Sequence, residues 1–317
     1  MRERVGAGAP GGSPFGSARP LVLDGGLGTT LEAMGVDVHG PAWSAAALHD
    51  DRDAIRAAHL AFFEAGADVA VTASYQVSFD GPAAAGADAA DVERAIRAST
   101  RLAREAAEIA QERDGRRRFV AASVGPYGAS LADGSEYTGD HGLTVAELRR
   151  WHRRRLEALA ATAPDVLAIE TIPSAAEAEA LLAEIEALGV PAWLSLTADG
   201  DRTRQGEPLA DVFAQAAGVE GIVAVGVNCC DRHAVAAAIA AARSAAPGLD
   251  LVVYPNGAGT WDALARAWRA EAEPDPLVAA PGWVGGGATL VGGCCRVGPE
   301  HIRALRAGLA AAGALEA

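Results

Sequence analysis

Lysine is absent from this chain of 317 residues, and all 27 of its basic residues are arginine. This absence excludes two common kinds of enzyme, those that form a Schiff base through lysine and those that hold phosphates in a Walker-type loop. Acidic residues outnumber basic ones, which gives a formal net charge of −14. Because no arginine-rich face stands out against that charge, we do not expect a nucleic-acid partner.

Long apolar runs are also missing. No stretch of 18 apolar residues occurs, so a transmembrane helix is not expected. Residues 1–19 contain no uninterrupted apolar segment of the kind that a signal peptide needs, and we expect a disordered tail there, followed by one domain over residues 20–317. The densest basic run, from Arg113 to Phe119, joins a predicted helix to a predicted strand and is expected to be a solvated turn.

Cysteine is scarce, but its placement is informative. The four cysteines form two adjacent pairs, Cys229-Cys230 and Cys294-Cys295, and each pair ends a short apolar run. Four thiols are too few for a disulfide scaffold, and the reducing cytoplasm in which we expect the protein would keep them free. The pairs lie too far apart for a zinc ribbon, so only the fold could bring them together.

Apolar segments alternate with amphipathic, alanine-rich segments along most of the chain. Eight strands are predicted near residues 21–26, 69–74, 119–125, 166–171, 192–197, 223–229, 251–256 and 289–295. Helices are predicted near residues 51–65, 88–113, 144–163, 174–188, 208–218, 231–246, 261–270 and 299–312. Eight strand-then-helix units predict a single-domain α/β protein with the (β/α)8 architecture of a TIM barrel. An open, doubly wound sheet remains the alternative.

Polar side chains gather at the carboxyl ends of the predicted strands, where barrel enzymes build their active sites. The two longest strand-to-helix loops, about 27–50 and 126–143, lie at the same end. The polar residues at strand ends are Asp24, Thr72, Ser74, Glu170, Thr171, Thr197, Asn228, Cys229, Asn256, Cys294 and Cys295. This coincidence predicts a functional site at that end of the barrel.

Three of the cysteines are candidate zinc ligands: Cys229, Cys294 and Cys295. Three thiolates around Zn²⁺ leave the fourth tetrahedral position to an external ligand, which is the pattern of a catalytic site. Cys294 and Cys295 can share an ion only if the strand has ended before them, and Gly292-Gly293 gives the backbone that freedom. The alternative is that the cysteines are small buried apolar residues, and this is our interpretation of Cys230.

Two acids, Asp24 and Glu170, end apolar strands, where a buried carboxylate is costly unless it is paired or hydrogen-bonded. Both could bind an ammonium group. Alternatively, Asp24 could brace the turn DGGLGT through backbone N–H groups, and Glu170 could pair with an arginine. The glycines after Asp24 do not form a dinucleotide-binding motif, since Leu31 stands where the third glycine belongs.

Taken together, these segments resemble the homocysteine S-methyltransferase family. The resemblance runs from about Leu21 to Ile302 and is carried by LDGGLGTTLE, TASYQVS, SVGPYGASLADGSEYTGDH, AIETIP, GVNCC, VVYPN and WVGGGATLVGGCCRVGPEHI. It implies a zinc-dependent (β/α)8 barrel with Cys229, Cys294 and Cys295 as ligands. It also places amino-acid-binding acids at Asp24 and Glu170, and glycines of the homocysteine site at Gly25, Gly26 and Gly226, near the segment 72–76.

The resemblance further implies an activity. The family transfers a methyl group to the thiol of homocysteine, and members of this length resemble enzymes that use S-methylmethionine or S-adenosylmethionine, so small-molecule substrates are expected. A family member that uses betaine as donor or selenocysteine as acceptor is the alternative, and a non-catalytic zinc-binding barrel is a more distant one. The chain departs from the family pattern at Ser130, His141 and Gly257-Ala258-Gly259, which bears on the donor pocket.

Overall fold

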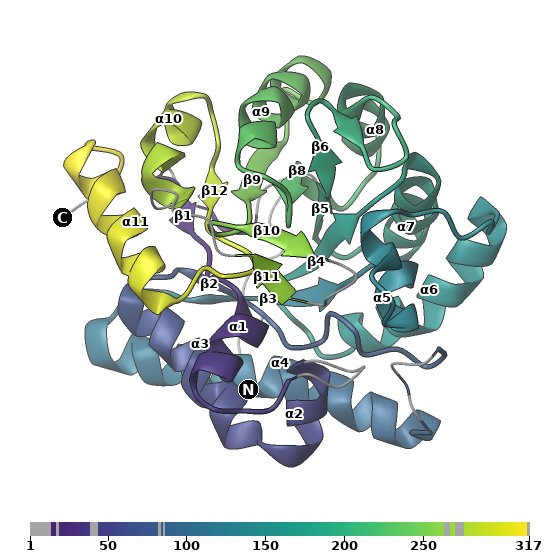
Figure 1. Cartoon of the computed structure of the whole chain (residues 1–317), viewed down its shortest axis with the longest axis horizontal. Coiled ribbons are helices and arrows are strands. Elements are labelled where there is room, and N and C mark those ends of the chain that lie inside the picture. Colours follow the sequence, from purple (N-terminus) through teal and green to yellow (C-terminus); the bar gives the residue numbers. More distant parts are fainter. Residues whose placement is uncertain are drawn as a thin grey trace, which may run out of the picture.

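The computed structural model describes residues 14–16, 19–38, 44–81, 84, 86–262, 267–269 and 276–315. Strands and helices alternate, and the helices surround a central sheet (Figure 1). The eight strands of that sheet are β1 (Leu21–Val22), β2 (Val69–Val71), β3 (Phe119–Val124), β4 (Val166–Ile172), β5 (Ala192–Leu196), β8 (Ile222–Asn228), β9 (Asp250–Tyr254) and β12 (Leu290–Val291). All eight expected strands are therefore present, several of them shorter than expected.

The longer helices also match the expected ones. They are α3 (Arg52–Ala65), α4 (Ala89–Asp114), α6 (Val145–Ala160), α7 (Ala175–Leu188), α8 (Leu209–Ala217), α9 (His233–Ala245) and α11 (Pro299–Ala311). Shorter elements are α1 (Leu27–Ala33), α2 (Ser44–Asp50), α5 (Tyr127–Leu131), η2 (Ser135–Tyr137), η3 (Pro276–Ala279) and α10 (Ala280–Gly285). Side chains cap several of these helices, as in the capping box between Thr144 and Glu147 at the start of α6.

The sheet closes into a barrel. Its strand order is β1-β12-β9-β8-β5-β4-β3-β2, which follows the chain around the barrel, and all of its pairs are parallel. A parallel bridge between Leu23 and Val69 joins β1 to β2, and the N–H of Asp68 donates to the carbonyl of Val22 at 2.6 Å. The predicted (β/α)8 fold is confirmed, and the open doubly wound alternative is wrong because the first and last strands of an open sheet do not meet.

Apolar side chains fill the lower part of the barrel. The interior cluster includes Phe119, Ala168, Trp193 and Ala224. Because every second residue of a strand points to the same face, Glu170 on β4 continues the interior row of Ala168. Polar side chains therefore lie directly above the apolar layers, at the carboxyl end of the barrel.

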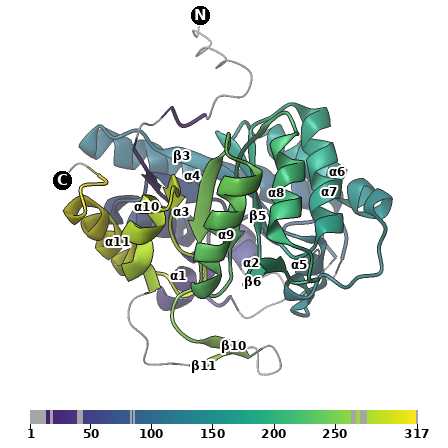
Figure 2. The same cartoon turned by 90° about the horizontal axis from the view of Figure 1, so that it is seen from above.

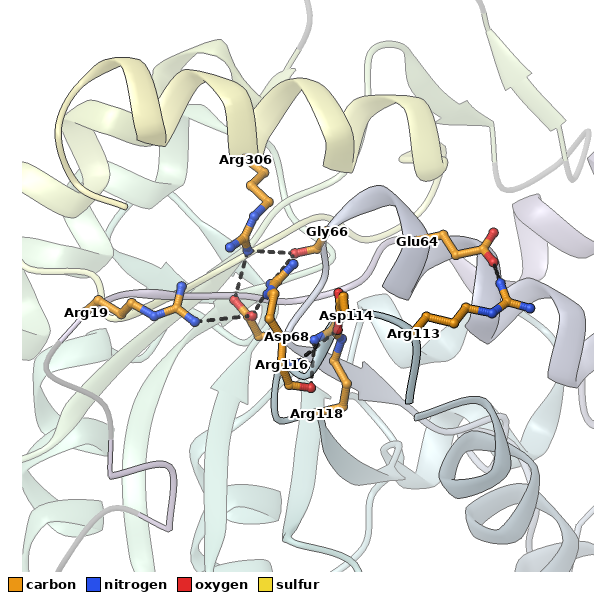
Figure 3. A network of polar contacts seen from close by, with 9 residues as sticks. All are labelled: Arg19, Glu64, Gly66, Asp68, Arg113, Asp114, Arg116, Arg118 and Arg306. Atoms are coloured by element: carbon orange, nitrogen blue, oxygen red, sulfur yellow. Dashed lines mark hydrogen bonds and ion pairs between the residues drawn. The ribbon is translucent and has the colours of Figure 1, made fainter. Parts of the chain in front are cut away.

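Asp68 anchors the opposite end of the barrel, where the first and last elements of the chain meet (Figure 3). Its side chain is buried, accepts the N–H of Val22 at 3.0 Å and pairs with the guanidinium groups of Arg19, Arg116 and Arg306. The expectation of a solvated turn at residues 113–119 is wrong for Arg118, which is 4% exposed and pairs with Asp114. The turn instead supplies ion pairs at the barrel seam, the junction between β1 and β2 where the barrel closes.

The segment after β9 differs from the expected structure. In place of the helix predicted near residues 261–270, β10 (Thr260–Asp262) pairs with β11 (Ala267–Arg269) in antiparallel register, while residues 263–266 and 270 lie outside the described part. Trp261 and Trp268 are partners in this register, and aromatic residues favour strands. Figure 2 shows the hairpin standing apart from the barrel, at the end where α1 and α5 lie.

Most of the expected N-terminal tail lies outside the described residues. Phe15 is described, however, and it packs edge-on against Phe119 with 5.1 Å between ring centroids. A further short hairpin, formed by β6 (Ala198–Asp199) and β7 (Arg202–Thr203), follows β5. None of the helices in the described part is long and apolar enough to cross a membrane.

Candidate active site

A cavity opens at the carboxyl end of the barrel, between the loops that follow the strands. Its lining is Asp24, Gly25, Gly26, Leu27, Gly28, Thr29, Val71, Thr72, Tyr75, Gln76, Glu136, Tyr137, Glu170, Thr171, Cys229, Tyr254, Gly293, Cys294 and Cys295. These residues come from loops far apart in the sequence, because parallel strands of a barrel all end at the same face. The cavity contains the three cysteines and the two acids that the sequence indicated.

The sulfur atoms of Cys229, Cys294 and Cys295 all lie within 4.8 Å of one another. The Sγ atoms of Cys229 and Cys295 are 3.8 Å apart. β12 ends at Val291, so the two C-terminal cysteines lie in a loop, where successive side chains can face one point. The carbonyl of Pro255 accepts the N–H of Cys294 at 2.8 Å, which ties this loop to the one after β9.

Cys229 leaves the strand in the left-handed region, with φ of 48°. A non-glycine residue in that region carries strain, which is frequent at functional sites. The hydroxyl of Thr197 donates to the carbonyl of Cys229 at 3.2 Å and helps to hold this conformation. Cys230, which we expected to be packing, is fully buried outside the sulfur cluster, and burial raises its pKa to about 12.

The three clustered thiols perturb one another. Hydrogen bonds from Cys294 and then Cys295 lower the pKa of Cys229 well below its usual value. The thiolate that results raises the pKa of both Cys294 and Cys295, through its hydrogen bonds to them, ahead of burial. The cluster therefore favours the charged form of one thiol and disfavours that of the other two, and a cation bound between them would offset this.

Tyr137 approaches the cluster from η2, in the long loop after β3. Its hydroxyl lies 3.3 Å from the Sγ of Cys229. Burial, and then the charge of Cys229, raises the pKa of Tyr137 well above its usual value, so the phenol stays protonated and can donate to the thiolate. Sequence reasoning did not single out this residue, although the length of its loop pointed to the region.

Asp24 and Glu170 are buried at the cavity wall, with exposures of 2% and 7%. Burial raises the pKa of Asp24 well above its usual value, and the charge of Glu170 raises it further. Burial also raises the pKa of Glu170 to about 7, against a hydrogen bond from Ser123 that lowers it. A bound cation would stabilise the charged forms of these two acids, which burial disfavours.

The two acids have different partners in the folded protein. The carboxylate of Asp24 accepts the backbone N–H of Val71 on β2 at 2.9 Å, so it braces the neighbouring strand. Glu170 has no ion pair with arginine among the described residues. Its hydrogen-bond donors Ser123 and Tyr254 are neutral, and the charge of Arg155 lowers its pKa without a direct ion pair.

Asn228 holds the strand end beside Glu170 in an unusual conformation. Thr171 has φ of 61°, which is rare for a β-branched residue. Its N–H donates to the Oδ1 of Asn228 at 2.7 Å, and the Nδ2 of Asn228 donates to its hydroxyl at 2.8 Å. The hydroxyl of Ser195 also donates to this Oδ1. This buried network fixes the backbone next to Glu170 and therefore the direction of the Glu170 side chain.

The glycines after Asp24 allow two loops to lie against each other. A Cβ on Gly26 would come within 2.7 Å of the carbonyl oxygen of Cys294, and one on Gly25 would overlap the carbonyl oxygen of Val297. Gly226 lies lower on β8, where a Cβ would overlap the carbonyl of Val252, and it is not one of the lining residues. Close packing against β9 therefore explains why position 226 is glycine.

The three departures from the family pattern lie outside the cavity lining. Ser130 is buried on α5, and its hydroxyl donates to the carbonyl of Tyr127 at 2.7 Å. The ring of His141 packs against the ring of Tyr127, with centroids 5.1 Å apart. Gly257 donates its N–H to the carbonyl of Cys295 at 2.7 Å, so it supports the cysteine loop from behind.

Comparison with known proteins agrees with the geometry. The family model described as homocysteine S-methyltransferase matches residues 21–309. A homocysteine S-methyltransferase of Escherichia coli strain K12 is 42% identical over 293 residues, which cover 90% of this chain and 94% of the relative. Homocysteine S-methyltransferase 4 of Zea mays is 40% identical over 322 residues, with 93% and 94% covered.

A solved structure gives the same result. The metallated form of the homocysteine methyltransferase MmuM from Escherichia coli superposes with a TM-score of 0.82 at 39% identity, and the match covers 92% of this chain and 97% of that one. Both the sequence and the fold are thus matched over most of their length. The chain belongs to the homocysteine S-methyltransferase family and is accordingly a methyltransferase.

Proposed function

We propose that the protein transfers a methyl group from a sulfonium donor, S-methylmethionine or S-adenosylmethionine, to the thiol of homocysteine, and that Cys229, Cys294 and Cys295 hold a zinc ion for this reaction. One observation carries the proposal: three sulfur atoms within 4.8 Å of one another share a cavity with two buried acids. The relatives named above are homocysteine S-methyltransferases, which supports the choice of acceptor.

The cysteine cluster fits zinc. Two thiolates bound at about 2.3 Å to a tetrahedral ion stand about 3.8 Å apart. The Sγ atoms of Cys229 and Cys295 have that separation. The described residues offer three ligands at this point, and a catalytic zinc site takes its fourth ligand from outside the protein. The Escherichia coli structure is of a metallated form, which also favours a metal here.

When bound, the ion would lower the pKa of the homocysteine thiol and so supply the thiolate nucleophile at neutral pH. The protein groups orient the acceptor. Asp24 and Glu170 can bind its ammonium group, which would compensate two buried carboxylates that otherwise keep raised pKa values. Tyr137 can donate to the Cys229 thiolate and so hold one ligand in place. Alignment of the two reacting atoms supplies most of the rate enhancement.

Atoms and charge balance in the proposed methyl transfer. The acceptor thiol loses its proton to solvent, and its sulfur forms a new bond to the methyl carbon. The bond between that carbon and the sulfonium breaks, and its electron pair stays on the donor sulfur, which becomes a neutral thioether. A site with three cysteinates and buried carboxylates is negative, and it favours a donor that carries positive charge on the sulfur. The products are methionine and the demethylated donor.

The proposal is tested by incubating zinc-loaded protein with homocysteine and each candidate donor, including betaine, and by measuring methionine. Cys229→Ala should lose zinc and methyl transfer while keeping the circular dichroism of the barrel, because the ligand lies above the apolar core. Cys230→Ala is the matched control, since this neighbouring thiol lies outside the cluster and its variant should keep zinc and activity. Full methyl transfer by Cys229→Ala would contradict the proposal.

A further inference from the structure

The cavity holds one acid more than the acceptor needs. Three carboxylates line it, from Asp24, Glu170 and Glu136, and none of the lining residues among those that the structure describes is lysine, arginine or histidine. The proposed function assigns Asp24 and Glu170 to the acceptor's ammonium group. Glu136 has no role in that assignment, and sequence reasoning did not single it out.

Glu136 lines the same cavity as the three clustered cysteines. It belongs to η2, in the loop after β3, and the next residue is Tyr137, whose hydroxyl lies 3.3 Å from the Sγ of Cys229. Asp24 follows β1 and Glu170 is on β4, so the three acids reach the cavity from different elements. The sulfur cluster therefore has a carboxylate near it that is separate from the acceptor pair.

The position of Glu136 is fixed by packing. A Cβ on Gly128 would come within 2.5 Å of the backbone nitrogen of Glu136, so the glycine lets η2 lie directly against α5. The side chain is only partly exposed. Its charge acts inside the cavity: after burial, Glu136 is the largest charge that raises the pKa of Tyr75, another lining residue.

The charges of the candidate donors differ. S-methylmethionine and S-adenosylmethionine each carry a sulfonium, an ammonium and a carboxylate, for a net charge of +1. Betaine carries one quaternary ammonium and one carboxylate, for a net charge of zero. A cavity lined by acids, with no basic side chain in its described lining, attracts the first class and gives little preference to the second.

We propose that Glu136 selects the methyl donor by charge, by pairing with the positive charge of a sulfonium amino acid bound over the cysteine cluster. The inference rests on the proposed function and extends it to the residue that sets donor choice. Removal of the carboxylate should weaken binding of S-methylmethionine at least tenfold, and it should leave binding of betaine unchanged or slightly stronger.

The test measures donor binding by titration calorimetry on zinc-loaded protein, and kcat/KM for the same donors with homocysteine. Glu136→Gln keeps the shape of the side chain and removes its charge, whereas Glu136→Asp keeps the charge and should retain the preference for S-methylmethionine. Asp140→Asn is the matched control, because it removes the same charge from an exposed residue of the same loop. It should change the binding of neither donor. Zinc content and the KM for homocysteine should stay constant in all three variants.

The two proposals fail differently. If the wild type makes no methionine with any donor, the proposed function is refuted, and the binding data still decide the role of Glu136. If the wild type is active but Glu136→Gln binds S-methylmethionine as tightly as before, the donor-selecting role is refuted and the proposed function stands. An equal loss of affinity for both donors would also refute the role, because it would indicate a general change in the structure of the loop.

Discussion

Glu170→Gln should make the protein more stable at alkaline pH while impairing its function. Burial raises the pKa of Glu170 from 4.5 to about 7. A carboxyl whose folded pKa is raised holds its proton more tightly in the folded state. It therefore contributes stability below pH 4.5, and this contribution is lost as the pH rises through 7. The loss is about 3 kcal/mol, since each tenfold change in the affinity of the carboxylate for its proton corresponds to about 1.4 kcal/mol.

Glutamine resembles the protonated acid at all pH values, so the variant escapes this loss. Its advantage in free energy of unfolding over the wild type should grow by about 2 kcal/mol between about pH 5.5 and pH 8, where most of the titration occurs. Urea unfolding of the metal-free proteins at the two pH values measures this difference. Glu186→Gln, at an exposed residue of α7, is the control and should show no such change.

The same substitution should weaken homocysteine binding, because Asp24 alone would then face the ammonium group. The hydroxyl of Ser123 can still donate to the amide oxygen of the glutamine, so the local hydrogen bond survives. The reasoning would be refuted if the stability difference between variant and wild type were the same at both pH values. That result would mean that the folded protein does not penalise the charge of Glu170.

Two further substitutions test how the fold supports the site. Asn228→Ala should lower the free energy of unfolding by about 3 kcal/mol and remove most of the activity, because it leaves the buried N–H of Thr171 without its partner and frees a strained backbone. Unfolding measurements and methionine assays check the two effects, and unchanged activity would count against the positioning role of Asn228. Asp68→Ala should lower the free energy of unfolding by about 3 kcal/mol, since it removes the buried partner of Arg116 and Arg306 at the barrel seam. The variant should still bind zinc. Loss of zinc in that variant would show that the seam and the site are coupled.

Local patterns in the sequence were sufficient to predict most of the barrel. Alternation of apolar and amphipathic segments predicted all eight strands, because buried parallel strands form short apolar runs that polar turns interrupt. Capping residues such as Thr144 and Ser174 marked helix starts correctly, since their hydrogen bonds are made within four residues. The pattern failed near residues 261–270, where alanine content suggested a helix but the chain pairs with itself in β10 and β11.

The residues of the candidate site could be predicted from the sequence, but their geometry could not. Doubled cysteines at strand ends and the acids Asp24 and Glu170 stood out because thiols and carboxylates are costly or unusual beside apolar strands. The 4.8 Å cluster of sulfur atoms, the approach of Tyr137 and the left-handed turn at Thr171 depend on contacts between residues distant in the sequence. Closure of the barrel decides these, because it alone brings the ends of β4, β8 and β12 to one cavity.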